Sequence, residues 1–237
     1  LGDVYKRQTP IFEACTFTSN FGRAGGGAVF TDASRASFTG CMFDDNASHI
    51  GGAFRCSNAI LGSLIELRGC TLQQNEAQNW SGGAMYLAPG YTVHATDCNF
   101  WGNDAVTDGG AILANAAALR MSNCDLSGNT AINGGAICAE DFSYVELVNV
   151  KLTQNDASTG GALFIDDGVS MNMTNCTSTL NSATIGGRSL TLASNASAEI
   201  TNSILYGDTG DSIASSGDLT CRYSIVPAAF AGPGCMS

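Results

Sequence analysis

Short stretches in which apolar and polar residues alternate recur along the chain, most of them a few residues before a cysteine. In the clearest of them Ile65, Glu66 and Leu67 precede Cys70. The pattern returns at residues 93–95, 119–121, 145–147, 171–173 and 198–200. Alternation with a period of two is typical of a strand with one buried face. Apolar residues continue through the cysteine, and a further apolar run such as residues 162–165 follows. Each unit is therefore predicted to hold about three short strands separated by turns.

Two sequence markers repeat with one common period. A Gly-Gly pair begins at Gly26, Gly51, Gly82, Gly109, Gly134, Gly160 and Gly186. The motif Cys-x-[Phe/Leu]-x-x-Asn opens at Cys15, Cys41, Cys70, Cys98 and Cys124, and Val150, Cys176 and Ser203 occupy the later cysteine positions. Both markers return about every 26 residues. A repeat of this length that persists along the chain is the signature of a solenoid.

The repeat excludes the other architectures that a chain of this composition could form. No segment offers a helical pattern of 12 residues, propeller blades need about 40 residues, and a regular leucine frame is absent. We therefore predict an all-β fold over residues 9–226, a right-handed single-stranded parallel β-helix of about 8–9 coils. Equivalent strands of successive coils would pair about 4.8 Å apart.

Each marker has a structural reason. Glycine permits positive φ and close backbone approach at a corner. The closing asparagine recurs at Asn20, Asn46, Asn75, Asn103, Asn129, Asn155 and Asn181, and a stacked asparagine forms an amide ladder. A second, partial ladder is predicted at Asn123, Asn149, Asn175 and Asn202.

The cysteines predict a column of buried thiols. Six of the ten, Cys15, Cys41, Cys70, Cys98, Cys124 and Cys176, share one inward position, which Val150 and Ser203 also fill. The rung spacing of about 4.8 Å exceeds the Cβ separation that a disulfide needs. For Cys221 and Cys235, which lie near the C-terminus, both a disulfide and free thiols remain open. Cys/His spacing typical of zinc sites is absent.

Composition and the two ends of the chain narrow the function. Residues 1–8 (LGDVYKRQ) resemble translated sequencing adaptor, and we expect residues 227–237 to form an irregular, truncated tail. The net charge of -11 disfavours nucleic-acid partners, and no apolar run of 18 residues is present to span a membrane. No cofactor other than calcium is expected.

The paired motif resembles the repeat of the polymorphic outer-membrane protein family. Residues 98–113 (CNFWGNDAVTDGGAIL) and 124–137 (CDLSGNTAINGGAI) are close to ideal copies of that repeat. Residues 200–208 and 219–226 resemble the last coils of bacterial surface β-helix proteins. The resemblance implies a secreted or surface-exposed passenger, often an adhesin, located outside the cell, at the cell surface or at the outer membrane.

One acidic group is a candidate site. Glu140 and Asp141 stand at the same offsets from Gly134 as Asp166 and Asp167 do from Gly160, so four carboxylates are expected at one corner. Such a cluster could be a solvated turn, a calcium site at all four residues, or a catalytic pair for glycoside cleavage that uses Asp141, Asp166 and Asp167.

Four aromatic residues suggest a ligand surface. Trp80, Tyr86, Tyr91 and Trp101 fall in two neighbouring coils, one of which is longer than the rest, and they could line a groove for sugar or protein. The sequence thus favours a non-enzymatic surface passenger that displays a binding surface to protein or carbohydrate ligands. The alternatives are a polysaccharide lyase or glycoside hydrolase that uses the acidic corner, and a purely structural stalk.

Overall fold

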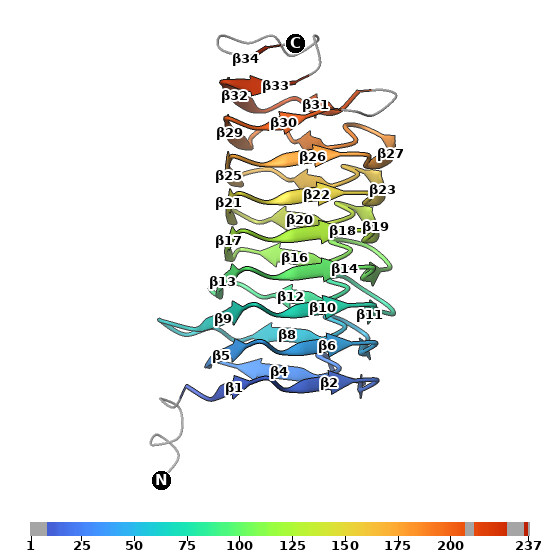
Figure 1. Cartoon of the computed structure of the whole chain (residues 1–237), viewed down its shortest axis with the longest axis vertical. Coiled ribbons are helices and arrows are strands. Elements are labelled where there is room, and N and C mark those ends of the chain that lie inside the picture. The colour runs from blue at the N-terminus through green and yellow to red at the C-terminus, as the bar shows by residue number, and fades with distance from the viewer. Residues whose placement is uncertain (1–8, 207–210, 227–234, 237) are drawn as a thin grey trace.

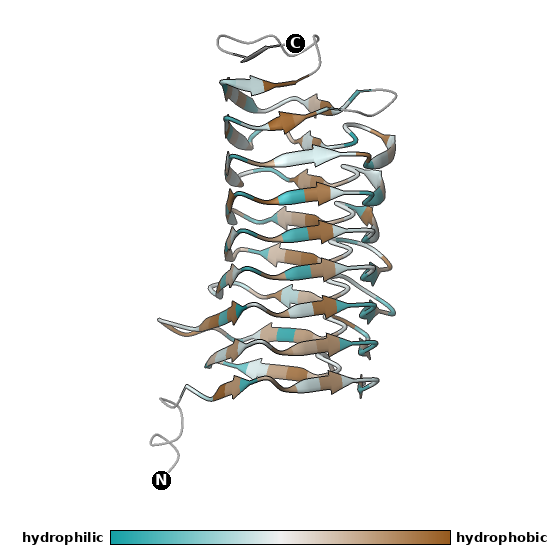
Figure 2. Cartoon of the chain, in the orientation of Figure 1, coloured by the Kyte–Doolittle hydropathy of each residue, from teal (hydrophilic) through white to brown (hydrophobic). Residues whose placement is uncertain are grey.

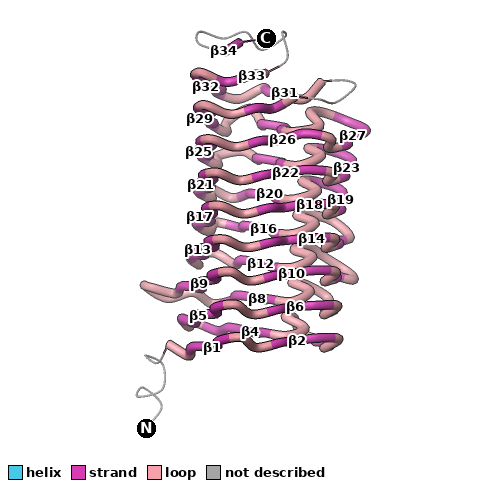
Figure 3. Tube along the Cα trace, viewed as in Figure 1, coloured by secondary structure: helices cyan, strands magenta, loops and turns pink. Residues whose placement is uncertain are grey.

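The computed structural model describes residues 9–206, 211–226 and 235–236, which form a single rod of stacked coils (Figure 1). Strands and the turns between them make up the whole of this part, and it contains no helix (Figure 3). Consequently no helix in the described part of the chain is long and apolar enough to cross a membrane. The predicted parallel β-helix is confirmed.

Four parallel sheets make up the rod, and from β1 to β28 each coil contributes one strand to each sheet in turn. Sheet A stacks β1 (Ile11–Glu13), β5 (Arg35–Thr39), β9 (Leu64–Arg68), β13 (Thr92–Thr96), β17 (Ala118–Ser122), β21 (Tyr144–Val148), β25 (Ser170–Thr174), β29 (Ser197–Thr201) and β32 (Asp218–Arg222). Sheet B stacks β2 (Thr16–Thr18), β6 (Met42–Asp44), β10 (Thr71–Gln73), β14 (Asn99–Trp101), β18 (Asp125–Ser127), β22 (Lys151–Thr153), β26 (Thr177–Thr179), β30 (Ile204–Leu205), β33 (Ser224–Ile225) and β34 (Cys235–Met236).

The other two sheets complete each coil. Sheet C stacks β3 (Phe21–Gly22), β7 (Ala47–Ser48), β11 (Glu76–Ala77), β15 (Asp104–Ala105), β19 (Thr130–Asn133), β23 (Asp156–Thr159) and β27 (Ser182–Ile185). Sheet D stacks β4 (Val29–Asp32), β8 (Phe54–Ser57), β12 (Met85–Leu87), β16 (Ile112–Asn115), β20 (Ile137–Glu140), β24 (Leu163–Ile165), β28 (Leu190–Leu192) and β31 (Ile213–Ser215).

The number of strands per coil differs from the prediction, because sheet C adds a fourth to the three expected. A strand such as β11 contains only Glu76 and Ala77, which is too short to show an alternating pattern. Pairing with the coils on either side, rather than its own sequence, defines it. At the C-terminal end β34 pairs with β33 within the segment expected to be irregular. The rest of that segment and residues 1–8 lie outside the described residues.

The core is the column of inward positions that the alternation predicts. Ile65, Leu67, Cys70 and Leu72 are fully buried, and their equivalents in the other coils join them in one cluster. The front strands β14, β18 and β22 show the same order of polar and apolar residues from coil to coil (Figure 2). At the N-terminal end the column is aromatic, and Phe12 stacks on Phe38 at 4.8 Å between ring centroids.

The Gly-Gly corner leaves no room for a side chain. The first glycine of each pair has positive φ, for example 73° at Gly82. A Cβ built on Gly83, the second glycine, would lie 2.0 Å from the carbonyl oxygen of Gly110. That separation is far below any real contact, so the next coil can stack here only on a glycine.

The asparagine ladder is continuous from Asn20 to Asn181. The side-chain amide of Asn75 donates to Oδ1 of Asn103 at 2.9 Å and to the carbonyl of Phe43 at 3.1 Å. Oδ1 of Asn103 also accepts the backbone N–H of Asn75. The members between the two ends of the ladder are buried, with every amide group satisfied. In the exposed second ladder, Asn149 donates to Asn123 at 3.0 Å and Asn202 to Asn175 at 2.6 Å.

The cysteines of the marker motif are free thiols that point into the rod. Cys15 is half-buried, whereas Cys41, Cys70, Cys98, Cys124 and Cys176 are buried. The Cys98 sulfur accepts the backbone N–H of Cys70 at 3.4 Å. Cys221 is also a free, buried thiol, because it occupies an inward position of the regular strand β32 opposite Ile200. The side chain of Cys235 lies outside the described residues.

Candidate binding site on the outer face of sheet D

The acidic residues that the sequence singles out lie in turns between sheets D and A. After β20, Ser143 donates its backbone N–H to the carbonyl of Glu140 at 3.3 Å, and Asp141 and Phe142 have φ of 55° and 62°. Two positive φ values in succession are the geometry of a type I′ turn, which favours Asn and Gly. Phe142 is therefore a bulky residue held in a costly backbone conformation.

The four carboxylates do not converge on one point. The amide of Asn115 donates to both Glu140 and Asp141 at 2.7 Å, which draws that pair towards the preceding coil. The amide of Asn195, in the following coil, donates to Asp167 at 3.1 Å. Among the described residues no three His, Cys, Asp or Glu side chains are grouped so that they could hold a metal ion.

The carboxyl group of Glu140 is half-buried at this corner. Burial raises its pKa, and the charges of Asp108, Asp141 and Asp166 raise it further, while the hydrogen bond from Asn115 opposes them. Asp141 and Asp167 are exposed, and Asp166 is half-buried. The corner thus holds one carboxyl that favours protonation, in a setting of neighbouring negative charge.

The four aromatic residues expected to form one patch occupy different parts of the coil. Trp101 lies on sheet B, Trp80 lies in the segment between sheets C and D, and Tyr86 lies on sheet D. Tyr91 is fully buried, and its hydroxyl accepts the backbone N–H of Ser34 at 3.1 Å. The prediction that Tyr91 contacts ligand is wrong, because its side chain occupies the inward position two residues before Val93.

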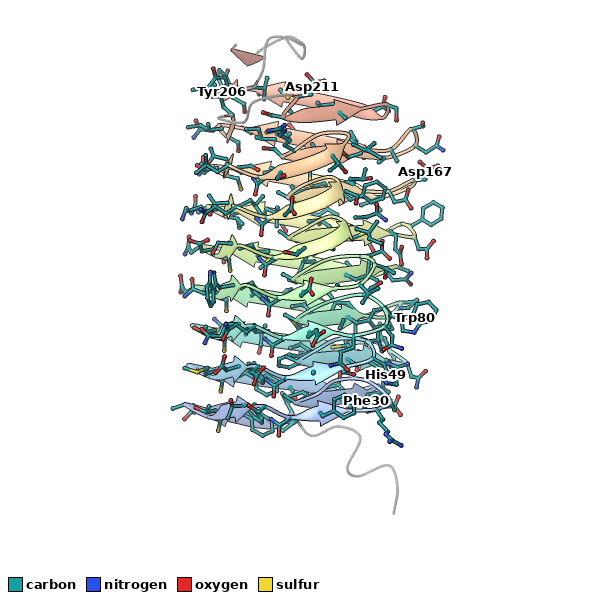
Figure 4. The ribbon with its side chains drawn as sticks, turned by 90° about the vertical axis from the view of Figure 1, so that its right-hand side faces the viewer. Phe30, His49, Trp80, Asp167, Tyr206 and Asp211 are labelled. Carbon is teal, nitrogen blue, oxygen red and sulfur yellow. The ribbon has the colours of Figure 1, made fainter. Side chains whose placement is uncertain are left out.

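A column of side chains on the outer face of sheet D was not anticipated as a unit. Parallel pairing places Phe30, Arg55 and Tyr86 on adjacent rungs, followed by Leu113 and Cys138. Each stands four residues after the start of a Gly-Gly pair, so a shared offset was the signal that could have revealed them. Leu113 and Cys138 are buried, and they separate the N-terminal part of the column from the half-buried Phe164 on the next rung. Phe30 and Trp80 follow the same side of the rod in Figure 4, and Asp167 lies on that side nearer the C-terminus.

A pocket of about 470 Å³ opens at the N-terminal end of this column. Its lining residues are Ala24, Phe30, Arg55, Ser57, Asn58, Ala59, Tyr86, Ala88 and Pro89. The volume lies in the range of small-molecule sites. Burial raises the pKa of Tyr86, and the charge of Glu140 raises it further, while that of Arg55 lowers it. Tyr86 therefore remains a neutral hydrogen-bonding phenol at physiological pH.

Among the described residues, Arg55 is the one charged residue that lines the pocket, and three neighbours hold its side chain. Its guanidinium donates to the Ala24 carbonyl and to the Ser57 hydroxyl, the latter at 3.1 Å. The same group lies over the Phe30 ring at 5.8 Å from the ring centroid. A second hollow of about 310 Å³ on sheet A includes the Glu199–Arg222 ion pair, whose charges already compensate each other at 3.6 Å.

The turns beside the pocket carry exposed apolar tips. The turn between β8 and β9 is longer than its equivalents, and it presents Ile60 and Leu61 to solvent. Leu61 is as exposed as in an extended peptide, at 105%, and Phe142 is 84% exposed. Single exposed apolar residues are common, but Leu61 and Phe142 lie on the same corner between sheets D and A, three coils apart, and such tips are suited to contact with another molecule.

Comparison with known families agrees with this architecture. A model of the right-handed β-helix region matches residues 3–112, and a model of the Chlamydia polymorphic membrane protein repeat matches residues 123–140. Neither the curated proteins nor the solved structures contain a significant match. The chain is a right-handed β-helix that carries a repeat of the polymorphic membrane protein type, which is characteristic of outer-membrane and surface proteins.

Proposed function

We propose that this β-helix of the polymorphic membrane protein type is the displayed rod of a secreted or cell-surface protein, and that it binds protein or carbohydrate ligands without transforming them. The turns between sheets D and A, such as residues 58–63 and 141–143, form what we call the D–A corner. The observation that carries the proposal is the contrast between a uniform interior and the exposed turns of this corner, which differ in length. Loops on a rigid scaffold are where binding residues concentrate.

Phe142 supports a binding role most directly. Its positive φ costs backbone energy, and at 84% exposure its ring gains little from burial within this chain. A strained, exposed aromatic side chain is the kind of outlier from which a functional hypothesis can start. Contact with a ligand would bury the ring and recover the apolar surface energy that the free protein leaves unused.

The test compares the tips of the D–A corner with a matched apolar residue elsewhere. The double variant Leu61→Ser, Phe142→Gly and the control Leu180→Ser would be screened on arrays of glycans and of surface proteins. Leu180 is also exposed, at 63%, but it lies after sheet B. We expect saturable binding that falls at least tenfold in the double variant and is unchanged in the control. Binding that both variants retain, or no binding at all, would contradict the proposal.

A carbohydrate-active enzyme is the second candidate, and the raised pKa of Glu140 is the observation that favours it. A general acid needs a carboxyl that stays protonated near neutral pH, beside a carboxylate that does not. Under this alternative the purified protein releases reducing ends from a polysaccharide, and Glu140→Gln abolishes the release. Binding without release of reducing ends would rule it out.

A further inference from the structure

The pocket around Arg55 has a charge imbalance. Arg55 is half-buried, and its hydrogen-bond acceptors, the Ala24 carbonyl and the Ser57 hydroxyl, are both neutral. Among the described residues no carboxylate forms an ion pair with it, although the chain has 21 acidic residues and only 10 basic ones. The other residues that line the pocket are uncharged. A partly desolvated cation without a counter-ion is costly, and an anionic ligand would supply one.

Two aromatic faces flank that cation. Phe30 and Tyr86 are the neighbours of Arg55 on the adjacent rungs, so the rings stand about 5 Å to either side along the rod. Phe30 is 52% exposed and Tyr86 is half-buried, which leaves both accessible from the pocket. Flat apolar rings with polar edges suit a ligand that presents one apolar face and one polar edge.

Hydrogen-bonding groups occupy the rim. The exposed amide of Asn58 makes no hydrogen bond within the part of the chain that the structure describes, and the neutral phenol of Tyr86 lies on the next rung from Arg55. A ligand with several hydroxyl groups would use these donors and acceptors, while its carboxylate meets the guanidinium. A peptide carboxylate would satisfy Arg55 as well, but it would leave fewer hydroxyl partners for the rim.

We propose that this pocket binds a carboxylate-bearing sugar, such as a hexuronic acid residue of an acidic polysaccharide. The inference rests on the proposed binding function and names one ligand class for the outer face of sheet D. The carboxylate pairs with Arg55, the sugar ring packs against Tyr86 or Phe30, and the sugar hydroxyls bond to Asn58 and the tyrosine phenol. No bond is made or broken.

The probe is a hexuronic acid tetrasaccharide, compared with its fully methyl-esterified form, which differs only by the loss of charge. Calorimetric titration of the intact chain is expected to show at least tenfold tighter binding of the acid, and a fall in that affinity as salt is raised. Arg55→Gln should abolish the difference between the two forms, whereas Arg55→Lys should retain part of it. Arg68→Gln, which alters an arginine on sheet A next to Glu66, should change nothing.

Two further variants guard against misfolding as an explanation. Tyr86→Ala leaves Arg55 in place and should weaken acid and ester by a similar factor. Glu140→Gln should strengthen binding of the acid two- to threefold, because it removes a negative charge about two rungs from Ala88, which lines the pocket. A gain of affinity cannot result from a damaged fold.

Equal affinity for acid and ester would overturn the assignment, as would equally tight binding of an acidic tetrapeptide of the same charge. If neither sugar binds while array ligands are still lost with the Leu61 and Phe142 tips, the pocket inference fails and the proposed function stands. If the acid binds at Arg55 but the tip variants bind array ligands normally, the pocket is correct and the proposed role of the tips is wrong.

Discussion

Two corners of the same coils differ in how regularly their residues repeat from coil to coil. At the corner between sheets B and C an asparagine recurs in seven coils, and each of the first six donates to the copy in the next coil at about the same distance. At the corner between sheets D and A the turns differ in length, and no residue is kept in every coil: the turns span residues 58–63 in one coil, 88–91 in the next and 141–143 in a later one.

The difference shows what a parallel stack constrains. A side chain that bonds to its own copy one rung away must be kept in every coil, because its loss leaves two neighbours without partners. A turn that points into solvent has no such partner, so each coil can change it independently. Uniformity therefore marks the scaffold, and variation marks the surface available for binding.

The largest loss of stability is expected from a substitution at the Gly-Gly corner, where the backbones of adjacent coils are in contact. In Gly110→Ala the new Cβ would lie 2.1 Å from the Gly135 carbonyl oxygen, so adjacent coils must separate. We expect the free energy of unfolding, measured with urea, to fall by more than about 4 kcal/mol. Gly69→Ala is the control, because its Cβ meets nothing within 4 Å and only positive φ opposes it, at a cost of about 1–2 kcal/mol. Similar losses for the two variants would contradict close stacking at the Gly-Gly corner.

The second largest loss of stability is expected from a substitution in the asparagine ladder. Asn103→Ala removes the acceptor of two Asn75 donors and the donor to the Leu72 carbonyl, all of them buried. The free energy of unfolding should fall by about 3 kcal/mol. Asn123→Gly, in the exposed ladder, should change it by less than about 1 kcal/mol, because water replaces the two lost bonds, to Asn149 and Asp97, and glycine tolerates the positive φ. A loss at Asn103 as small as that at Asn123 would show that the buried ladder is not what holds this corner.

The buried thiols predict a loss of stability in alkali. Burial raises the pKa of Cys56 to about 12 in the folded protein, from about 9 for an unfolded thiol. Its stabilising contribution is full below pH 9 and decreases as pH rises toward 12, because only the unfolded chain releases the proton there. The slope is up to about 1.4 kcal/mol per pH unit for one thiol. Cys56→Val should remove that share from the pH dependence of unfolding. An unchanged slope would mean that the thiol ionises in the folded state.

The smallest change in stability is expected for Phe142→Gly, and it is a gain. In Phe142→Gly the strained positive φ is relieved, and little buried area is lost because the ring is 84% exposed. Thermal unfolding should show a gain of up to about 1 kcal/mol. A clear loss of stability would place Phe142 among the residues that support the fold, and the contrast between the two corners would then be weaker than stated.

The sequence was most informative where the repeat constrains single residues. The alternation around Ile65 and Leu67 predicts that these side chains are buried. The constant spacing of the asparagine and glycine residues predicts that they stack in columns. Sheet C could not be predicted, because Glu76 and Ala77 are too few to show a period. The register of Glu140 with Asp166 follows from the repeat, but the direction of their side chains depends on Asn115 and Asn195, which belong to other coils.

The aromatic residues show the same limit. Tyr91 is expected at the ligand surface from its residue type, but it continues the alternation that runs through Val93, and the structure places it inside. Phe30, Arg55 and Tyr86 are 25 to 31 residues apart in sequence, and only the winding of the chain makes them neighbours. A site built across coils is therefore visible only once equivalent positions are aligned.

One distance measurement tests the winding on which the account depends. Glu66, Asn172 and Thr220 occupy the same outward column of sheet A, with Asn172 four rungs and Thr220 six rungs from Glu66. Spin labels on cysteines introduced at Glu66 and Asn172, and at Glu66 and Thr220, should give distances of about 19 Å and 29 Å by pulsed electron resonance. A Glu66–Thr220 distance equal to or shorter than the Glu66–Asn172 distance would contradict one coil per repeat.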